Sequence, residues 1–194
     1  FLANYAFTSD GTLWALMDNE TGPETLTIGR YDGASWHYHD LAADGGSWMS
    51  VIAAAGPNVV VVEAALERTP APDRVVGLSV STDAGATWHE LTDPDDVERS
   101  LPFNVSQNPD DWFSGYTSIA FAGTSTLYVA DGSGALWRSS DFVTFSKVSV
   151  PGAVTDHRVS DLRPAGDAVL GRLDDGDDLV RIAADGSVEV IASR

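Results

Sequence analysis

The stretch Ser81-Thr82-Asp83-Ala84-Gly85-Ala86-Thr87-Trp88 decides the fold. Its form is S-x-D-x-G-x-T-W, and the fixed positions are Ser81, Asp83, Gly85, Thr87 and Trp88. Each suits a tight turn between two strands: the carboxylate of Asp83 can accept hydrogen bonds from backbone N–H groups, and Gly85 can adopt a positive φ. Thr87 re-enters the strand, and Trp88 buries a large ring. Turn chemistry explains every fixed residue, so we predict a structural hairpin turn and no catalytic role for Asp83.

Weaker copies of this turn occur at 31–36, 139–145 and 184–188. Each copy joins two short segments of alternating β-branched and aromatic residues, which is the pattern of a β-hairpin. The first copy predicts strands over Leu26–Tyr31 and Trp36–Leu41, and the third predicts strands over Ala135–Ser139 and Phe145–Val150. Two more such segments precede each hairpin. In the first and third repeats these preceding segments have similar sequences, at 6–14 and 120–128. No stretch of a dozen residues has a clean helical period. The repeats predict an all-β fold, a β-propeller of four-stranded antiparallel blades with four blades in this chain. A sandwich of short strands is the competing interpretation, because its turns have similar spacing.

The four turns resemble those of the Asp-box (bacterial neuraminidase repeat) β-propeller proteins, and the resemblance covers nearly the whole chain. This superfamily includes sialidases, xyloglucan-hydrolysing enzymes, sortilin-type receptors and photosystem-assembly factors. The resemblance implies the propeller fold and a secreted, periplasmic or cell-surface location. It also implies rings of more than four blades, so we expect the chain to be part of a larger ring, completed by further blades or by a second copy. It fixes no activity, since these proteins share the turn and little else.

Composition excludes several classes of protein. The chain of 194 residues has 29 acidic and 11 basic residues and a net charge of −18, so a basic surface for nucleic acid is not expected. The absence of cysteine excludes disulfides and zinc-thiolate sites. No apolar run is long enough to span a membrane. A hydrophobic fraction of 43% is ordinary for a folded domain.

The chain is predicted to form one propeller domain or propeller segment, with blades at approximately 1–41, 42–93, 114–150 and 157–194. The long loop 93–114 far exceeds an ordinary connection and is therefore a candidate ligand-binding element. Aromatic rings near carboxylates suit sugar recognition. The candidate ligand-binding residues, on loops that we expect at one face of the ring, are Asp110, Asp111, Trp112, Glu67 and Arg68. Alternatively, Trp112 and Phe113 anchor the loop onto the ring.

Most of the excess negative charge falls in the loops of that face, Asp131 among them. The loop between the second and third strands of the fourth blade is the densest, and it carries Asp174, Asp175, Asp177 and Asp178. These residues could supply part of the six to eight oxygens of a Ca²⁺ site, but their spacing matches no EF-hand loop, so diffuse screening by cations is the preferred interpretation. His37 and His39 share one face of a strand, where either metal binding or a solvated polar edge is conceivable. No other cofactor is expected.

No catalytic constellation can be assembled from these motifs. Arg30, Arg138 and Arg181 occupy matching places on the third strand of their blades, which repetition explains without the arginine triad of sialidases. We therefore predict a binding or assembly module, with a glycan or protein partner and with carbohydrate as one candidate ligand. The alternative is a secreted glycoside hydrolase, sialidase-like or xyloglucanase-like, whose catalytic residues lie partly outside this segment. A purely structural repeat is the third interpretation.

Overall fold

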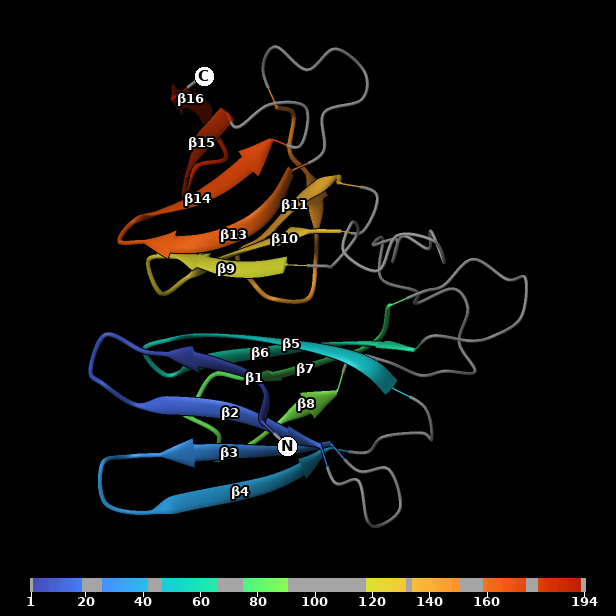
Figure 1. Ribbon diagram of the computed structural model, residues 1–194, viewed down its shortest axis with the longest axis vertical. Coiled ribbons are helices and arrows are strands. Elements are labelled where there is room, and N and C mark those ends of the chain that lie inside the picture. The colour runs from blue at the N-terminus through green and yellow to red at the C-terminus, as the bar shows by residue number, and fades with distance from the viewer. Residues whose placement is uncertain are drawn as a thin grey trace. The chain divides into compact units, whose positions relative to one another are not determined.

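The computed structural model describes residues 2–18, 26–41, 47–65, 75–90, 118–131, 134–150, 159–173 and 178–192. The chain divides into two compact units, Phe1–Leu101 and Pro102–Arg194. Each unit contains two four-stranded antiparallel sheets, and the strands of each sheet follow one another in chain order (Figure 1). The described ranges contain strands and turns but no helix. The predicted all-β fold of four-stranded antiparallel sheets is therefore confirmed.

The sheets of the first unit are β1–β4 and β5–β8. Their bounds are β1 (Leu2–Phe7), β2 (Leu13–Asp18), β3 (Leu26–Tyr31), β4 (Trp36–Leu41), β5 (Ser47–Ala55), β6 (Asn58–Ala65), β7 (Val75–Ser81) and β8 (His89–Glu90). The hairpin of β3 and β4 has the bounds that the sequence predicts. Trp88, by contrast, lies just before β8 and not in the strand.

The sheets of the second unit are β9–β12 and β13–β16. Their bounds are β9 (Ser118–Ala122), β10 (Thr126–Ala130), β11 (Leu136–Ser139), β12 (Ser146–Lys147), β13 (Val159–Ala165), β14 (Ala168–Leu173), β15 (Asp178–Ala183) and β16 (Val188–Ala192). The prediction of a strand over 145–150 is wrong in its length, because β12 has two residues. Its partner β11 has four residues, and just beyond β12 the N–H of Val148 still donates to the oxygen of Leu136 at 2.8 Å.

The core of the first unit lies between its two sheets. Side chains alternate between the faces of a strand, so one face of the first sheet presents Trp14, Leu16 and Ile28. They pack with buried Val59 and Val61 of β6. Burial of each such aliphatic side chain stabilises the unit by about 1.5–3 kcal/mol.

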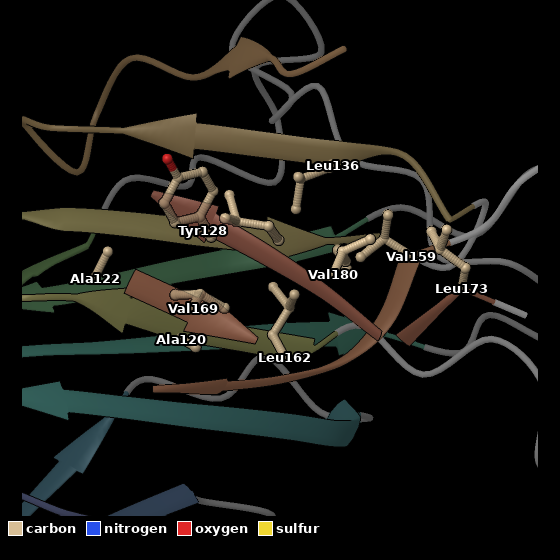
Figure 2. Packing of buried hydrophobic residues seen from close by; sticks show 11 residues of the cluster. Ala120, Ala122, Tyr128, Leu136, Val159, Leu162, Val169, Leu173 and Val180 are labelled. Carbon is tan, nitrogen blue, oxygen red and sulfur yellow. The ribbon is translucent and has the colours of Figure 1, made fainter. Parts of the chain in front are cut away.

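The second unit has its own core between β9–β12 and β13–β16 (Figure 2). Leu162, Val169 and Val180 gather there with the ring of Tyr128. Tyr128 is fully buried, and its hydroxyl donates to the backbone oxygen of Ala183 at the end of β15. One side chain of the third sheet thus binds the backbone of the fourth.

Candidate binding site

The turn 81–88 is held together by the carboxylate of Asp83. It accepts from the hydroxyl of Ser81 at 2.9 Å, the backbone N–H of Thr87 at 2.8 Å and the hydroxyl of Thr87 at 2.6 Å. The N–H of Gly85 donates to Ser81 Oγ at 2.8 Å. Because these donors favour the charged form, the Thr87 hydroxyl foremost, the pKa of Asp83 falls to about 2. Asp83 is therefore an ionised structural group and holds no proton to donate at neutral pH.

The other three turns use a carboxylate in the same way. Backbone N–H groups donate to Asp32, Asp141 and Asp185 over distances of 2.7–3.0 Å. The N–H of Thr144 contributes most to lowering the pKa of Asp141 to about 2. The N–H of Ser35 does the same for Asp32, whose pKa lies well below the usual range. All four turn carboxylates are engaged by their own turns.

A pocket of about 220 Å³ lies in the first unit, where β3 and β4 face the turn 81–88. Aromatic side chains form much of its lining. The rings of Trp14 and Trp88 meet edge to face at 6.2 Å between centroids, with an interplanar angle of 80°. The ring of His39 stacks on Trp88 at 5.4 Å and 10°. The guanidinium carbon of Arg30 lies 5.8 Å from the centroid of Trp14, which is cation–π distance.

The turn and β3 are connected at this pocket through Ala84. Its φ of 58° is left-handed, which costs an L-residue about 1–2 kcal/mol. The surrounding structure holds it there: its N–H donates to the oxygen of Pro57 at 2.9 Å, and its carbonyl accepts from Arg30 Nη1 at 3.4 Å. The second distance is near the limit of a hydrogen bond, so Arg30 is only weakly anchored.

Three donors of the pocket lining have no partner in the part of the chain that the structure describes. They are the indole N–H groups of Trp14 and Trp88 and the Nε–H of Arg30, all buried. Trp14 itself is only 2% exposed. A buried donor without an acceptor costs about 1–3 kcal/mol. Among its described residues, the first unit therefore holds three unsatisfied side-chain N–H groups, on residues that also line one pocket.

The second unit satisfies the corresponding groups. Tyr128 lies opposite Arg138 in the ladder, as Trp14 lies opposite Arg30. The hydroxyl of Tyr128 donates to Ala183, and Arg138 Nε donates to the oxygen of Ala184 at 2.8 Å. A phenol carries its donor at the tip of the ring, whereas an indole carries it on the side. The tip of the Trp14 ring, which approaches Gly85, is hydrocarbon.

Most residues that the sequence singled out as ligands or metal ligands lie outside the described residues. They are Asp110, Asp111, Trp112, Glu67, Arg68, Asp174, Asp175 and Asp177. Asp178 begins β15 and is partly buried. Within the described ranges, no three His, Cys, Asp or Glu side chains are placed to hold a metal ion, and no helix is long and apolar enough to cross a membrane.

One side chain departs from its predicted surroundings. Asp131 is not an exposed loop acid: it is buried, and its carboxylate accepts from Ala135 N and Trp137 Nε1, both at 2.9 Å. His37 and His39 both line the pocket, where Nε2 of His37 lies 3.0 Å from Asp32. Sequence reasoning missed the pocket itself. The sequence does contain one relevant difference between repeats: the first repeat has Trp14 at the place where the third repeat has Tyr128.

No protein-family model matches the sequence, and no curated protein matches it. Solved structures do match the fold. One, described as YCF48 bound to D1 peptide, is 16% identical with a TM-score of 0.52 and covers 97% of this chain and 54% of its own. The match to YjhT has 12% identity and a TM-score of 0.54, and it covers 100% of this chain and 66% of the YjhT chain. The match to human WBSCR16 has 11% identity and a TM-score of 0.54, and it covers 94% of this chain and 49% of the WBSCR16 chain.

YCF48 and YjhT are β-propellers, so the four sheets of this chain are propeller blades. The chain spans about half the length of the YCF48 chain that it matches. At these identities the likeness establishes the fold and nothing about ligands or chemistry.

Proposed function

We propose that this chain is an extracytoplasmic Asp-box propeller that acts as a binding or assembly module and takes a carbohydrate in the pocket of its first unit. The observation that carries the proposal is the pocket lining, which combines the rings of Trp14, Trp88 and His39 with the guanidinium of Arg30. Sugars stack on aromatic rings and accept hydrogen bonds through their oxygens. The Asp-box assignment is supported by four hairpin turns, each with an aspartate that accepts from turn N–H groups.

Binding is favoured over hydrolysis because the pocket offers no free carboxyl group among the described side chains. A glycoside hydrolase needs a carboxylic acid of raised pKa and a second carboxylate across the scissile bond. Asp83 lines the pocket, but its pKa is about 2 and its oxygens are bound by the turn. Asp32 is engaged by its own turn and by His37.

The assembly part of the proposal is supported by the outer face of the first sheet, which lies opposite the core of the unit. The large side chains exposed there are Tyr5 at 57%, Phe7 at 61%, Trp36 at 39% and Tyr38 at 62%. A cluster of exposed aromatic side chains marks an interaction surface more often than free surface. We infer that this face packs against a further blade, from the remainder of a longer chain or from a second copy.

Binding is tested by adding neutral oligosaccharides to ¹⁵N-labelled protein and following the six tryptophan indole N–H signals. We expect the signals of Trp14 and Trp88 to shift. The indole of Trp137, which donates to Asp131 in the second unit, is the internal control and stays in place. Shifts of all three alike, or none, contradict the proposal. Release of chromophore from aryl glycosides would instead support the glycoside hydrolase, and recovery of the protein from the cytoplasm would contradict the extracytoplasmic location.

A further inference from the structure

We propose that β4, the outer edge of the first sheet, binds a basic peptide that joins the sheet as a fifth, antiparallel strand. β4 is the last strand in the order β1-β2-β3-β4 (Figure 1). The proposal goes beyond glycan binding and uses a different part of the strand. The pocket lies on one face of the sheet, against the turn 81–88, whereas the peptide site is the row of backbone N–H and C=O groups along the edge.

β4 is the long, regular edge among the four outer strands. Its six residues pair with β3 without a bulge. The outer strands of the second and third sheets, β8 and β12, have two residues each. In the fourth sheet, β16 pairs with β15 through a register shift between Leu179 and Val180. Proteins blunt sheet edges with short strands and bulges, because a regular edge is a template for another strand. Among the four outer strands described, only β4 keeps that template.

The hydrogen-bond pattern determines which residues of β4 face outward. Hydrogen-bonded and non-hydrogen-bonded pairs alternate along an antiparallel ladder. The N–H of Asp32 donates to the oxygen of Ser35, so the pair that precedes β4 is a hydrogen-bonded one. Counted from that pair, the first, third and fifth residues of β4 direct their N–H and C=O groups away from β3. These residues are Trp36, Tyr38 and Asp40, and all three are exposed.

The side chains of these three residues indicate the sequence of the peptide. Residues directly opposite each other in an antiparallel pair share a face, where aromatic residues pair well with β-branched ones and opposite charges attract. The rings of Trp36 and Tyr38 stack at 6.1 Å with an interplanar angle of 6°, so they offer a flat surface to two β-branched residues. Asp40 offers a carboxylate to a lysine or arginine. A further blade on the same face covers side chains and leaves the backbone edge available.

Charge favours a basic peptide over a second copy of the chain. Each copy has a net charge of −18, so two β4 edges repel each other, whereas a basic peptide is attracted. The carboxylate of Asp32 lies just before β4 and adds to this attraction. It stays ionised because turn N–H groups, that of Ser35 foremost, hold the pKa of Asp32 well below its usual range.

The test adds the peptide acetyl-Lys-Thr-Val-Thr-Val-Lys-amide to the ¹⁵N-labelled full chain. We expect the backbone N–H signals of Trp36, Tyr38 and Asp40 to shift and their hydrogen exchange to slow. Those of His37 and His39, which are bonded within the sheet, should change less. N-methylation of both valines removes the N–H groups that face β4 and should abolish binding, whereas N-methylation of both threonines is the matched control and should preserve it. Glutamate in place of lysine should weaken binding about tenfold or more.

Variants of the chain test the edge and the register. Tyr38→Pro removes one outward N–H, which an edge strand tolerates, and should weaken binding about tenfold because an acceptor of the peptide loses its partner. Tyr38→Thr keeps that N–H and should retain binding. Asp40→Lys should reduce the preference for the lysine peptide over the glutamate peptide. Glu189→Lys makes the same change of charge on β16 and should leave that preference in place.

Each contrary outcome overturns a defined part of the proposal. Equal binding of the N-methyl-valine peptide and its parent overturns strand addition, and equal binding of the lysine and glutamate peptides overturns the basic partner. A dimer of the chain that Tyr38→Pro dissociates makes a second copy the occupant and overturns the peptide. Peptide-induced shifts of the Trp14 and Trp88 indoles without any change in β4 overturn the edge as the site. Because oligosaccharide binding is measured at those indoles and strand addition at the β4 backbone, either proposal can fail while the other stands.

Discussion

Replacement of Gly85 by alanine should destabilise the first unit through a contact that only this turn has. A Cβ atom at Gly85 would lie 2.7 Å from Cη2 and 3.1 Å from Cζ3 of Trp14. The Trp14 ring has little room to move, because it is 2% exposed and packs in the core of the unit. Gly85 also has a φ of +83°, which strains any L-residue.

The magnitude follows from the two effects. The left-handed backbone costs about 1–2 kcal/mol. Forcing a methyl group against a packed core ring costs about 1–3 kcal/mol more. We expect Gly85→Ala to lower the free energy of unfolding by about 2–5 kcal/mol.

Two other turn glycines separate the effects. A Cβ at Gly33, with φ +95°, meets nothing within 4 Å, and at Gly186, with φ +94°, it meets only Cδ of Arg138 at an ordinary 3.7 Å. Alanine at either position should cost only the backbone term, about 1–2 kcal/mol. Equilibrium urea unfolding of the three variants measures the difference. If Gly85→Ala is no less stable than Gly33→Ala, then Trp14 does not press on the turn, and the described geometry of the pocket is wrong.

Three further predictions concern stability. Tyr128→Phe removes the hydroxyl that binds the backbone carbonyl at the end of β15 and should cost about 1–3 kcal/mol, measured by urea unfolding. The pKa values of Asp83 and Asp141 are both about 2, against an ordinary value of 3.8, so the two carboxylates stabilise the folded state fully above pH 3.8 and lose that contribution as the pH falls toward 2. Titration of the carboxyl groups followed by ¹³C NMR measures these pKa values, and ordinary values would contradict the prediction. With a net charge of −18, NaCl should raise the melting temperature, and CaCl₂ at matched ionic strength should raise it equally; an extra calcium effect, lost on Asp175→Asn with Asp177→Asn, would contradict diffuse screening.

The hairpins could be predicted because their determinants are local. The strands Leu26–Tyr31 and Trp36–Leu41 follow from period-two alternation on either side of a turn with Asp and Gly. The same reasoning fails for 145–150, where alternation continues but only Ser146 and Lys147 pair with β11 in the ladder. A strand needs a partner, and the number of residues that pair with that partner is not written in the strand's own sequence.

The binding site depended on packing that the sequence does not display. Repetition aligned Arg30 with Arg138, but neither residue reveals that its guanidinium reaches the turn of the following sheet. Asp131 looked like one of many loop acids, because nothing local distinguishes a carboxylate that turns back onto Trp137 from one that faces water. The pocket exists only where two sheets meet, so residues distant in sequence define it.

The contacts of Arg30 and Arg138 make the order of sheets directional. In each unit the guanidinium belongs to the earlier sheet and the carbonyl to the later one. Arg181 has the same place in the last sheet, and its guanidinium lies 3.3 Å from the exposed carboxylate of Asp167, which follows the β13 strand of the same sheet. Each sheet thus has one face that carries the arginine and another that carries the accepting carbonyl. Sheets of this kind therefore join head to tail, because two arginine-bearing faces brought together would place two positive charges against each other. Head-to-tail contacts are heterologous, so they close into a ring only if the rotation from one sheet to the next divides a full turn evenly.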